Sequence, residues 1–357
     1  MDTEMTDKIA EAVEESIDEV VVEISSCGLA IAYTSILIMA FVPIYIGSRW
    51  SLHNEEAETM SQKDAYMFPV VGSCVLFGLY LLFKFFSKEY INYLLTAYFL
   101  VFGIGTMVMS YSPLIGLFAP ASLKSKEYKI SFNFLCVIPY VTPDMVNFAP
   151  TIVDMITCVF CCALSGWYVM EKHWIVNNIL GFAFSLQAIS MLNLGSYRIG
   201  CILLGGLFLY DIFWVFGTDV MVTVARSFDA PVKLLFPKDI FAAEYQFAML
   251  GLGDIVIPGV FVALLLRFDA HLAGFKKSQK MEKASFPQTF FHVNCVAYIL
   301  GLATTIGVMH FFQAAQPALL YLVPYVIGAS LITAVVKGKL GELLMFEEEE
   351  GEKEKEQ

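Results

Sequence analysis

Residues 247–258 decide how this chain is organised, and they read Phe247-Ala248-Met249-Leu250-Gly251-Leu252-Gly253-Asp254-Ile255-Val256-Ile257-Pro258. Asp254 is the only charged residue within residues 247–266. An apolar run of about 20 residues is long enough to cross a bilayer. A carboxylate inside such a run costs on the order of 2.5–3.5 kcal/mol on insertion scales. An acid at this place therefore predicts a function and a partner.

The predicted partner is Asp211, the only acid in the preceding apolar run, residues 197–217. Asp211 lies 14 residues after Tyr197, which is about 21 Å along a helix. Asp254 lies seven residues after Phe247, which puts it about 10 Å from the opposite face of the membrane. Because consecutive spans run antiparallel through a core of about 30 Å, the two carboxyl groups are predicted to share a level.

Two acids held together where water is scarce cannot both ionise easily, so the pair shares one proton. One acid can then deprotonate a water while the other donates to a carbonyl oxygen, which is the chemistry of aspartic proteolysis. The depth argument alone leaves two alternatives open: a pair of structural acids, and a proton relay in a proton-coupled transporter or channel. A third acid, Asp154, lies three residues from the start of the apolar run 151–170 and is expected at the interface.

Three motifs occur in order in three apolar runs: Tyr210-Asp211, Gly251-Leu252-Gly253-Asp254 and Gln316-Pro317-Ala318-Leu319. Together they resemble the GxGD-type intramembrane aspartyl proteases. Longer stretches resemble the signal peptide peptidase family rather than presenilin. These are Gly205-Gly206-Leu207-Phe208-Leu209-Tyr210-Asp211, Phe213-Trp214-Val215-Phe216-Gly217, Gln316-Pro317-Ala318-Leu319-Leu320-Tyr321-Leu322-Val323-Pro324, and Lys172-His173-Trp174-Ile175 with Asn177-Asn178. The resemblance runs from about residue 28 to residue 338.

The resemblance implies an intramembrane aspartic endopeptidase whose catalytic residues are Asp211 and Asp254. It implies cleavage of remnant signal peptides and type II membrane proteins, without a metal, another cofactor or the helper subunits of presenilin. Expected partners are transmembrane peptides and membrane lipids; a homo-oligomer is left open, and no nucleic acid is expected. The residues expected to bind substrate are Tyr210, Gly251, Leu252, Gly253, Pro317, Ala318 and Leu319.

The glycines, the proline and the tyrosine of these motifs can fill the roles that the resemblance implies, but each glycine and the tyrosine could instead serve packing. Gly251 and Gly253 allow close backbone approach beside the acid, either by an unwound substrate or by a packed helix. Pro317 has no N–H and suits the first turn of a helix. Tyr210 either bonds the acids or packs. A non-catalytic membrane factor that captures misfolded spans is a third reading, and the intact pair of acids argues against it.

The composition, 58% hydrophobic over 357 residues, indicates a polytopic membrane protein. Its acidic charge lies in the two tails, which are expected to be solvated. The predicted fold is all-α, similar to presenilin and signal peptide peptidase, with nine transmembrane helices at residues 27–47, 68–86, 91–118, 151–170, 174–194, 197–217, 247–266, 287–312 and 317–336. The predicted parts are an acidic lumenal segment (1–26), helices one to five (27–194), the catalytic helices six to nine (195–340) and an acidic cytosolic tail (341–357).

The distribution of Lys and Arg predicts the orientation. With the C-terminus in the cytosol, the cytosolic segments hold 15 of the 22 basic residues and the other side holds seven. Lys353 and Lys355 resemble a retrieval signal of the endoplasmic reticulum, although a mixed-charge tail would look the same. The expected location is therefore the endoplasmic reticulum membrane, with a lumenal N-terminus. No Asn-x-Ser/Thr sequence is present.

Overall fold

The structure is a computed structural model, and it describes residues 26–54, 57–120, 130–131, 147–148, 150–228, 230–240, 245–275, 286–312 and 316–348. Among these residues, nine helices are long and apolar enough to cross a membrane, so the all-α polytopic prediction is confirmed. They are α2 (Ser26–Ser51), α3 (Gln62–Phe85), α4 (Lys88–Phe118), α6 (Ile152–Glu171), α7 (Trp174–Met191), α8 (Tyr197–Phe216), α10 (Gly253–Leu272), α11 (Thr289–Phe312) and α12 (Leu319–Val336). Nearly all of predicted segment 1–26, and the predicted retrieval signal, lie outside the described residues.

Shorter elements connect the long helices. The helices are α9 (Val220–Ser227) and α13 (Leu340–Leu344). The strands form three pairs: β1 (Glu58–Met60) parallel to β4 (Leu192–Leu194), β2 (Ile130–Ser131) antiparallel to β3 (Asn147–Phe148), and β5 (Lys233–Pro237) antiparallel to β6 (Phe247–Gly251). Of these, the hairpin of β5 and β6 bears on the site, because it lies between α8 and α10 in the chain.

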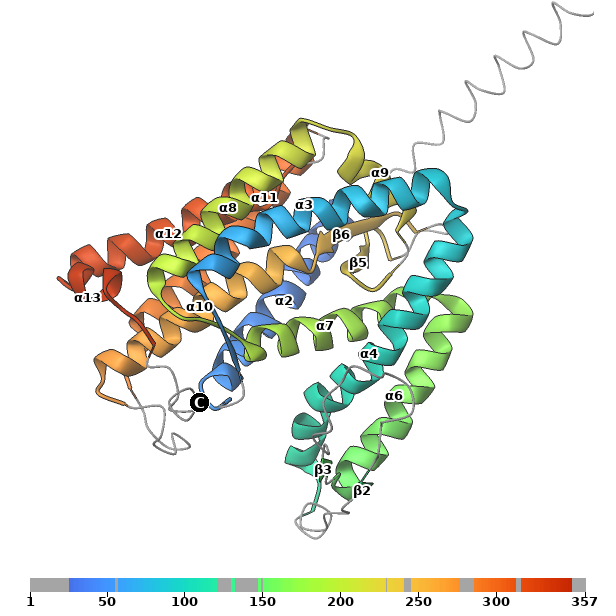
Figure 1. Cartoon of the computed structure of the whole chain (residues 1–357), viewed down its shortest axis with the longest axis horizontal. Helices are drawn as coiled ribbons and strands as arrows, with labels where there is room; N and C mark the ends of the chain where they lie inside the picture. Colours follow the sequence, from blue (N-terminus) through green and yellow to red (C-terminus); the bar gives the residue numbers. More distant parts are fainter. Residues whose placement is uncertain are drawn as a thin grey trace, which may run out of the picture.

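The helix α10 forms the centre of the fold, where α2, α7, α8, α11 and α12 all contact it (Figure 1). Within its apolar stretch 78% of residues are buried, against 6% for α3 on the outside. The helices α4 and α6 make a separate pair that reaches the other helices chiefly through α7. Asp154 closes a capping box with Thr151 at the start of α6, so this acid caps a helix.

The seventh span begins later than the sequence predicted. Residues 247–251 form strand β6, and the helix starts only at Gly253. A short apolar run has the same pattern in a strand and in a buried helix. Here the run forms a strand because β5 pairs with it along its whole length. Asp254 consequently lies in the first turn of α10, directly after a strand.

The same span also ends later than predicted, at Leu272. Arg267 and Asp269 fall between the predicted spans 247–266 and 287–312, but they lie inside α10 and are 8% and 3% exposed. Asp269 accepts hydrogen bonds from the backbone N–H groups of Phe290 (3.2 Å) and Phe291 (2.9 Å) in the first turn of α11. Partners from other elements thus keep both charges within the helix.

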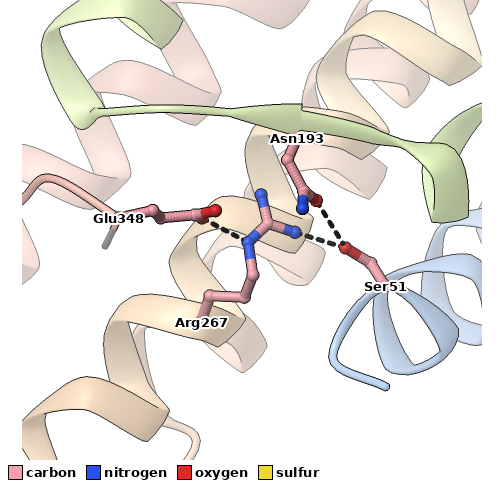
Figure 2. Close-up of polar contacts among 4 residues, drawn as sticks. All are labelled: Ser51, Asn193, Arg267 and Glu348. Carbon is pink, nitrogen blue, oxygen red and sulfur yellow. Dashed lines mark hydrogen bonds and ion pairs between the residues drawn. The ribbon is translucent and has the colours of Figure 1, made fainter. Parts of the chain in front are cut away.

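Residues 340–348, here called the C-terminal strap, fold back over the ends of α8 and α10. Phe346 is buried against Phe268, with ring centroids 5.1 Å apart, and the N–H of Glu348 bonds to the carbonyl of Gly195 at 2.9 Å. Figure 2 shows Arg267 between Glu348 on one side and Ser51, at the end of α2, on the other. The tail predicted as solvated from residue 341 is therefore packed as far as residue 348.

Candidate active site

Asp211 lies on the inner face of α8 and is 6% exposed. Its Oδ2 accepts a hydrogen bond from the backbone N–H of Leu319 at 3.1 Å. Leu319 is the first residue of α12, and the N–H groups of a first helical turn have no partner inside their own helix. The carboxylate from one helix therefore caps the next, which fixes the direction of the Asp211 side chain.

Asp254 occupies the first turn of α10 and is partly exposed. A Cβ atom added to Gly251 would lie 3.3 Å from Oδ2 of Asp254, whereas a Cβ added to Gly253 would meet no described atom within 4 Å. Gly251 thus leaves room for the carboxylate itself, and Gly253 borders open space beside it. The hydroxyl of Tyr298 donates to the backbone carbonyl of Asp254 at 3.3 Å.

The two acids belong to helices in contact, since α8, α10 and α12 all touch one another. The charge of Asp211 acts on the carboxyl group of Asp254, so the pair lies within electrostatic reach. Two carboxyl groups in one poorly solvated site can share a proton and activate a water between them. The arrangement can thus perform acid–base hydrolysis with these two side chains.

The strand β6 leads into Asp254 and has one open edge. Two flanking backbone bonds, Lys238 N–H to Gln246 (2.7 Å) and Leu252 N–H to Val232 (3.0 Å), fix which residue pairs of β5 and β6 exchange hydrogen bonds. These pairs are Leu234 with Leu250 and Phe236 with Ala248. The N–H and C=O groups of Met249 and Gly251 therefore point away from β5. No hydrogen bond joins them to any residue that the structure describes.

The place where β6 ends and where α8, α10 and α12 are in contact is here called the junction. The other predicted substrate residues lie around it, some buried before a helix and some packed against neighbouring helices. Pro317 and Ala318 are buried directly before α12. The side chain of Leu252 packs towards Gly181 of α7. Tyr210 turns its ring towards α3, where a Cβ on Gly72 would be 3.7 Å from it. The structure thus gathers the three motifs at one junction, with Tyr210 and Leu252 in packing positions.

Sequence reasoning gave no role at the site to Tyr298, Asn177 or Asn178. Tyr298 is fully buried on α11 and looked like an ordinary aromatic residue of an apolar span. The two asparagines are buried on α7 and bond to the backbone of β5. Two adjacent amides in an apolar helix could have indicated a contact with another segment, because a buried amide requires hydrogen-bond partners.

Comparisons with known proteins agree with this geometry. A model of the signal peptide peptidase family matches residues 52–350. The chain is 46% identical over 331 residues to the signal peptide peptidase of Mus musculus, covering 90% of this chain and 84% of the relative. It is 45% identical to the Homo sapiens protein of that name over the same shares. A probable intramembrane protease of Schizosaccharomyces pombe is 36% identical over 313 residues, 87% of this chain and 92% of the relative.

Proposed function

Because the chain belongs to the signal peptide peptidase family, and is thereby an intramembrane aspartic protease, we propose that Asp211 and Asp254 form its catalytic dyad. The observation that supports this most is the junction itself. The two acids come from contacting helices, Asp254 is within electrostatic reach of Asp211, and Leu319 orients Asp211. The proton-coupled transporter has no support, since the relatives described above are named as peptidases or proteases.

In the proposed reaction one acid takes a proton from a water, and the resulting oxygen nucleophile attacks the scissile carbonyl carbon. The other acid protonates the carbonyl oxygen, which gives a gem-diol. When the C–N bond breaks, the proton taken from the water passes to the leaving nitrogen, and the acid that gave up its proton regains one from a diol hydroxyl. No covalent intermediate with the enzyme forms. Because the two acids titrate as one unit, the base and acid roles belong to the pair.

The open edge of β6 supports a way of holding the substrate. The backbone groups of a transmembrane helix are bonded to one another and shielded, so the substrate must unwind before water can attack it. Unwinding leaves N–H and C=O groups without partners. The outward groups of Met249 and Gly251 can pair with them as an added strand, and the space beside Gly253 leaves room for it.

We infer that the substrates are remnant signal peptides and anchors of type II membrane proteins. The name shared by the two mammalian relatives supports the first group. Both groups are single apolar spans, which helix-weakening residues would make easier to unwind. The remaining predicted substrate contacts, lipid partners, a homo-oligomer and the four-part division of the chain stay predictions.

The proposed location is the endoplasmic reticulum membrane, with the N-terminus in the lumen and the C-terminus in the cytosol. The distribution of Lys and Arg supports this orientation. The C-terminal strap then lies on the cytosolic side, together with the ends of α2 and α10. Signal peptides are released in that membrane, which brings substrate and enzyme together.

The test of the dyad uses purified protein and a synthetic signal peptide in detergent. We expect Asp211→Asn and Asp254→Asn to abolish cleavage, and Asp254→Asn to prevent labelling by an aspartic protease inhibitor that mimics the transition state. Asp219→Asn is the matched control, because Asp219 is exposed outside the site, and we expect this substitution to leave cleavage unchanged. Retained hydrolysis by the Asp254→Asn protein would falsify the proposal.

A further inference from the structure

Two adjacent amides, Asn177 and Asn178, are the fourth and fifth residues of α7 and are 3% and 8% exposed. Burying an amide without a hydrogen bond is costly, so their partners indicate why they are there. Neither residue contacts Asp211 or Asp254 through any bond of the described residues. Their partners lie on the hairpin that precedes Asp254.

The amides bond to one edge of β5 in the way that a neighbouring strand would. Asn178 donates from Nδ2 to the carbonyl of Leu235 at 2.6 Å, and its Oδ1 accepts from the N–H of the same residue at 2.8 Å. Asn177 donates from Nδ2 to the carbonyl of Lys233 at 2.7 Å. Lys233 and Leu235 are two residues apart, so both present these groups on the edge that faces away from β6.

The hairpin consequently has two edges with different properties. The α7 amides occupy the β5 edge, while the β6 edge at Met249 and Gly251 carries no hydrogen bond to the described residues. An unpaired edge is a template for any extended chain. If both edges were open, an unwound substrate could pair on β5, on the far side of the strand that leads into Asp254.

We propose that Asn177 and Asn178 are positioning residues for proteolysis, which hold the hairpin against α7 and leave β6 as the edge where substrate pairs. This rests on the proposed function. The amides act through β5 and touch no reacting atom. Their bonds fix the register of β6 relative to Asp254, and that register selects which peptide bond of the substrate reaches the dyad.

The variants that test this are Asn178→Leu, which removes both bonds to Leu235, and the milder Asn177→Leu, which removes one. The matched control is Asn294→Leu. Asn294 is a fully buried amide of α11 whose one hydrogen bond among the described residues lies within its own helix, to the carbonyl of Phe290 at 3.0 Å. All are assayed as full-length protein in detergent with the same signal peptide, alongside Asp254→Asn.

We expect Asn178→Leu to raise KM about tenfold, with a smaller change in kcat, because two hydrogen bonds that order the hairpin are lost. Mass spectrometry of the products should show cleavage spread to neighbouring peptide bonds. Asn177→Leu should do the same to a lesser degree. Inhibitor labelling of the dyad should persist in both, and Asn294→Leu should keep the wild-type cleavage position.

Two outcomes overturn the inference. One is an unchanged KM and an unchanged cleavage position in both hairpin variants. The other is a parallel decrease in kcat, in inhibitor labelling and in unfolding temperature, as in the Asn294→Leu protein. Such a pattern would show that the amides only stabilise the fold. If Asn178→Leu does not fold, Asn177→Leu decides by the same criteria. Cleavage by Asp254→Asn would instead contradict the proposed function, so the two failures are distinguishable.

Discussion

Two buried acids of the described chain accept backbone hydrogen bonds from the first turn of another helix, Asp211 from one N–H group and Asp269 from two. A carboxylate is stabilised there because these donors have no partner within their own helix. Asp254 differs, since it is partly exposed and borders open space at Gly253. The same interaction thus joins helices at Asp269 and orients a reactive group at Asp211.

The residue-scale prediction concerns Gly253. We expect Gly253→Val to lower kcat/KM by at least tenfold while the unfolding temperature stays close to that of the wild type. A Cβ on Gly253 would meet no described atom within 4 Å, so we expect the valine to disturb little packing while it fills the space proposed for the substrate. Peptide cleavage and thermal unfolding in detergent measure the two effects.

The control for this prediction is Gly166→Val on α6, another glycine with open space around it. It lies on a helix far along the chain from the dyad, and both measurements should stay near wild type. A Gly253→Val protein that loses stability and activity together would show that this glycine serves helix packing, the alternative left open by the sequence.

At the scale of elements, the C-terminal strap is joined to α10 by a buried ion pair. Arg267 and the Glu348 side chain are 8% and 12% exposed. Arg267 also donates to Ser51, which donates in turn to Asn193 of β4 at 3.3 Å (Figure 2). One guanidinium group therefore connects α2, β4, α10 and the strap at the end of the fold opposite the start of α10.

Removing one partner of a buried pair leaves an uncompensated charge, which costs about 3–5 kcal/mol. We expect Arg267→Met to lower the unfolding temperature in detergent by several degrees. The double variant with Glu348→Gln should recover part of the loss, because no buried charge is then left alone. Equal instability of the single and double variants would contradict this account.

The comparison pair for this prediction is Lys339 with Glu342, whose nitrogen and oxygen are 2.6 Å apart and whose side chains are 43% and 51% exposed. Pairs in water contribute about 0–1 kcal/mol. Lys339→Met should therefore leave the unfolding temperature almost unchanged. The two pairs differ in burial and in sequence separation, and the larger effect is expected for the buried, long-range pair.

At the scale of the whole molecule, the direction in which the chain crosses the membrane decides which compartment each end of the site faces. We expect Glu4→Asn to be glycosylated in cells, because it creates an acceptor sequence with Thr6 in the segment proposed to be lumenal. The wild-type chain has no such sequence, so any added mass that a glycosidase removes reports this position alone.

The control for the orientation is an acceptor sequence appended after Gln357, which should stay unmodified on the cytosolic side. Glycosylation of the appended sequence, with none at Glu4→Asn, would reverse the proposed orientation. The C-terminal strap would then lie on the lumenal side, and the start of α10 would face the cytosol. The fold and the chemistry of the site would be unchanged.

The sequence by itself determined the number of spans and singled out the two acids, although the bounds it predicted for the seventh span were wrong. Apolar runs of sufficient length have few alternatives in a bilayer, and a carboxylate inside one is costly enough to stand out. The motifs around Asp211, Asp254 and Leu319 determined the family. These features depend on the local chain alone, so neighbouring residues were enough to reveal them.

Only the tertiary structure decided which contacts complete the site. Residues 247–251 became a strand because β5 pairs with them, and β5 is held by Asn177 and Asn178 from another helix. Arg267 stays in a helix because Glu348, distant in sequence, reaches it. Hydrogen bonds between remote segments leave no periodic pattern in the sequence, and their geometry is fixed only when the helices pack.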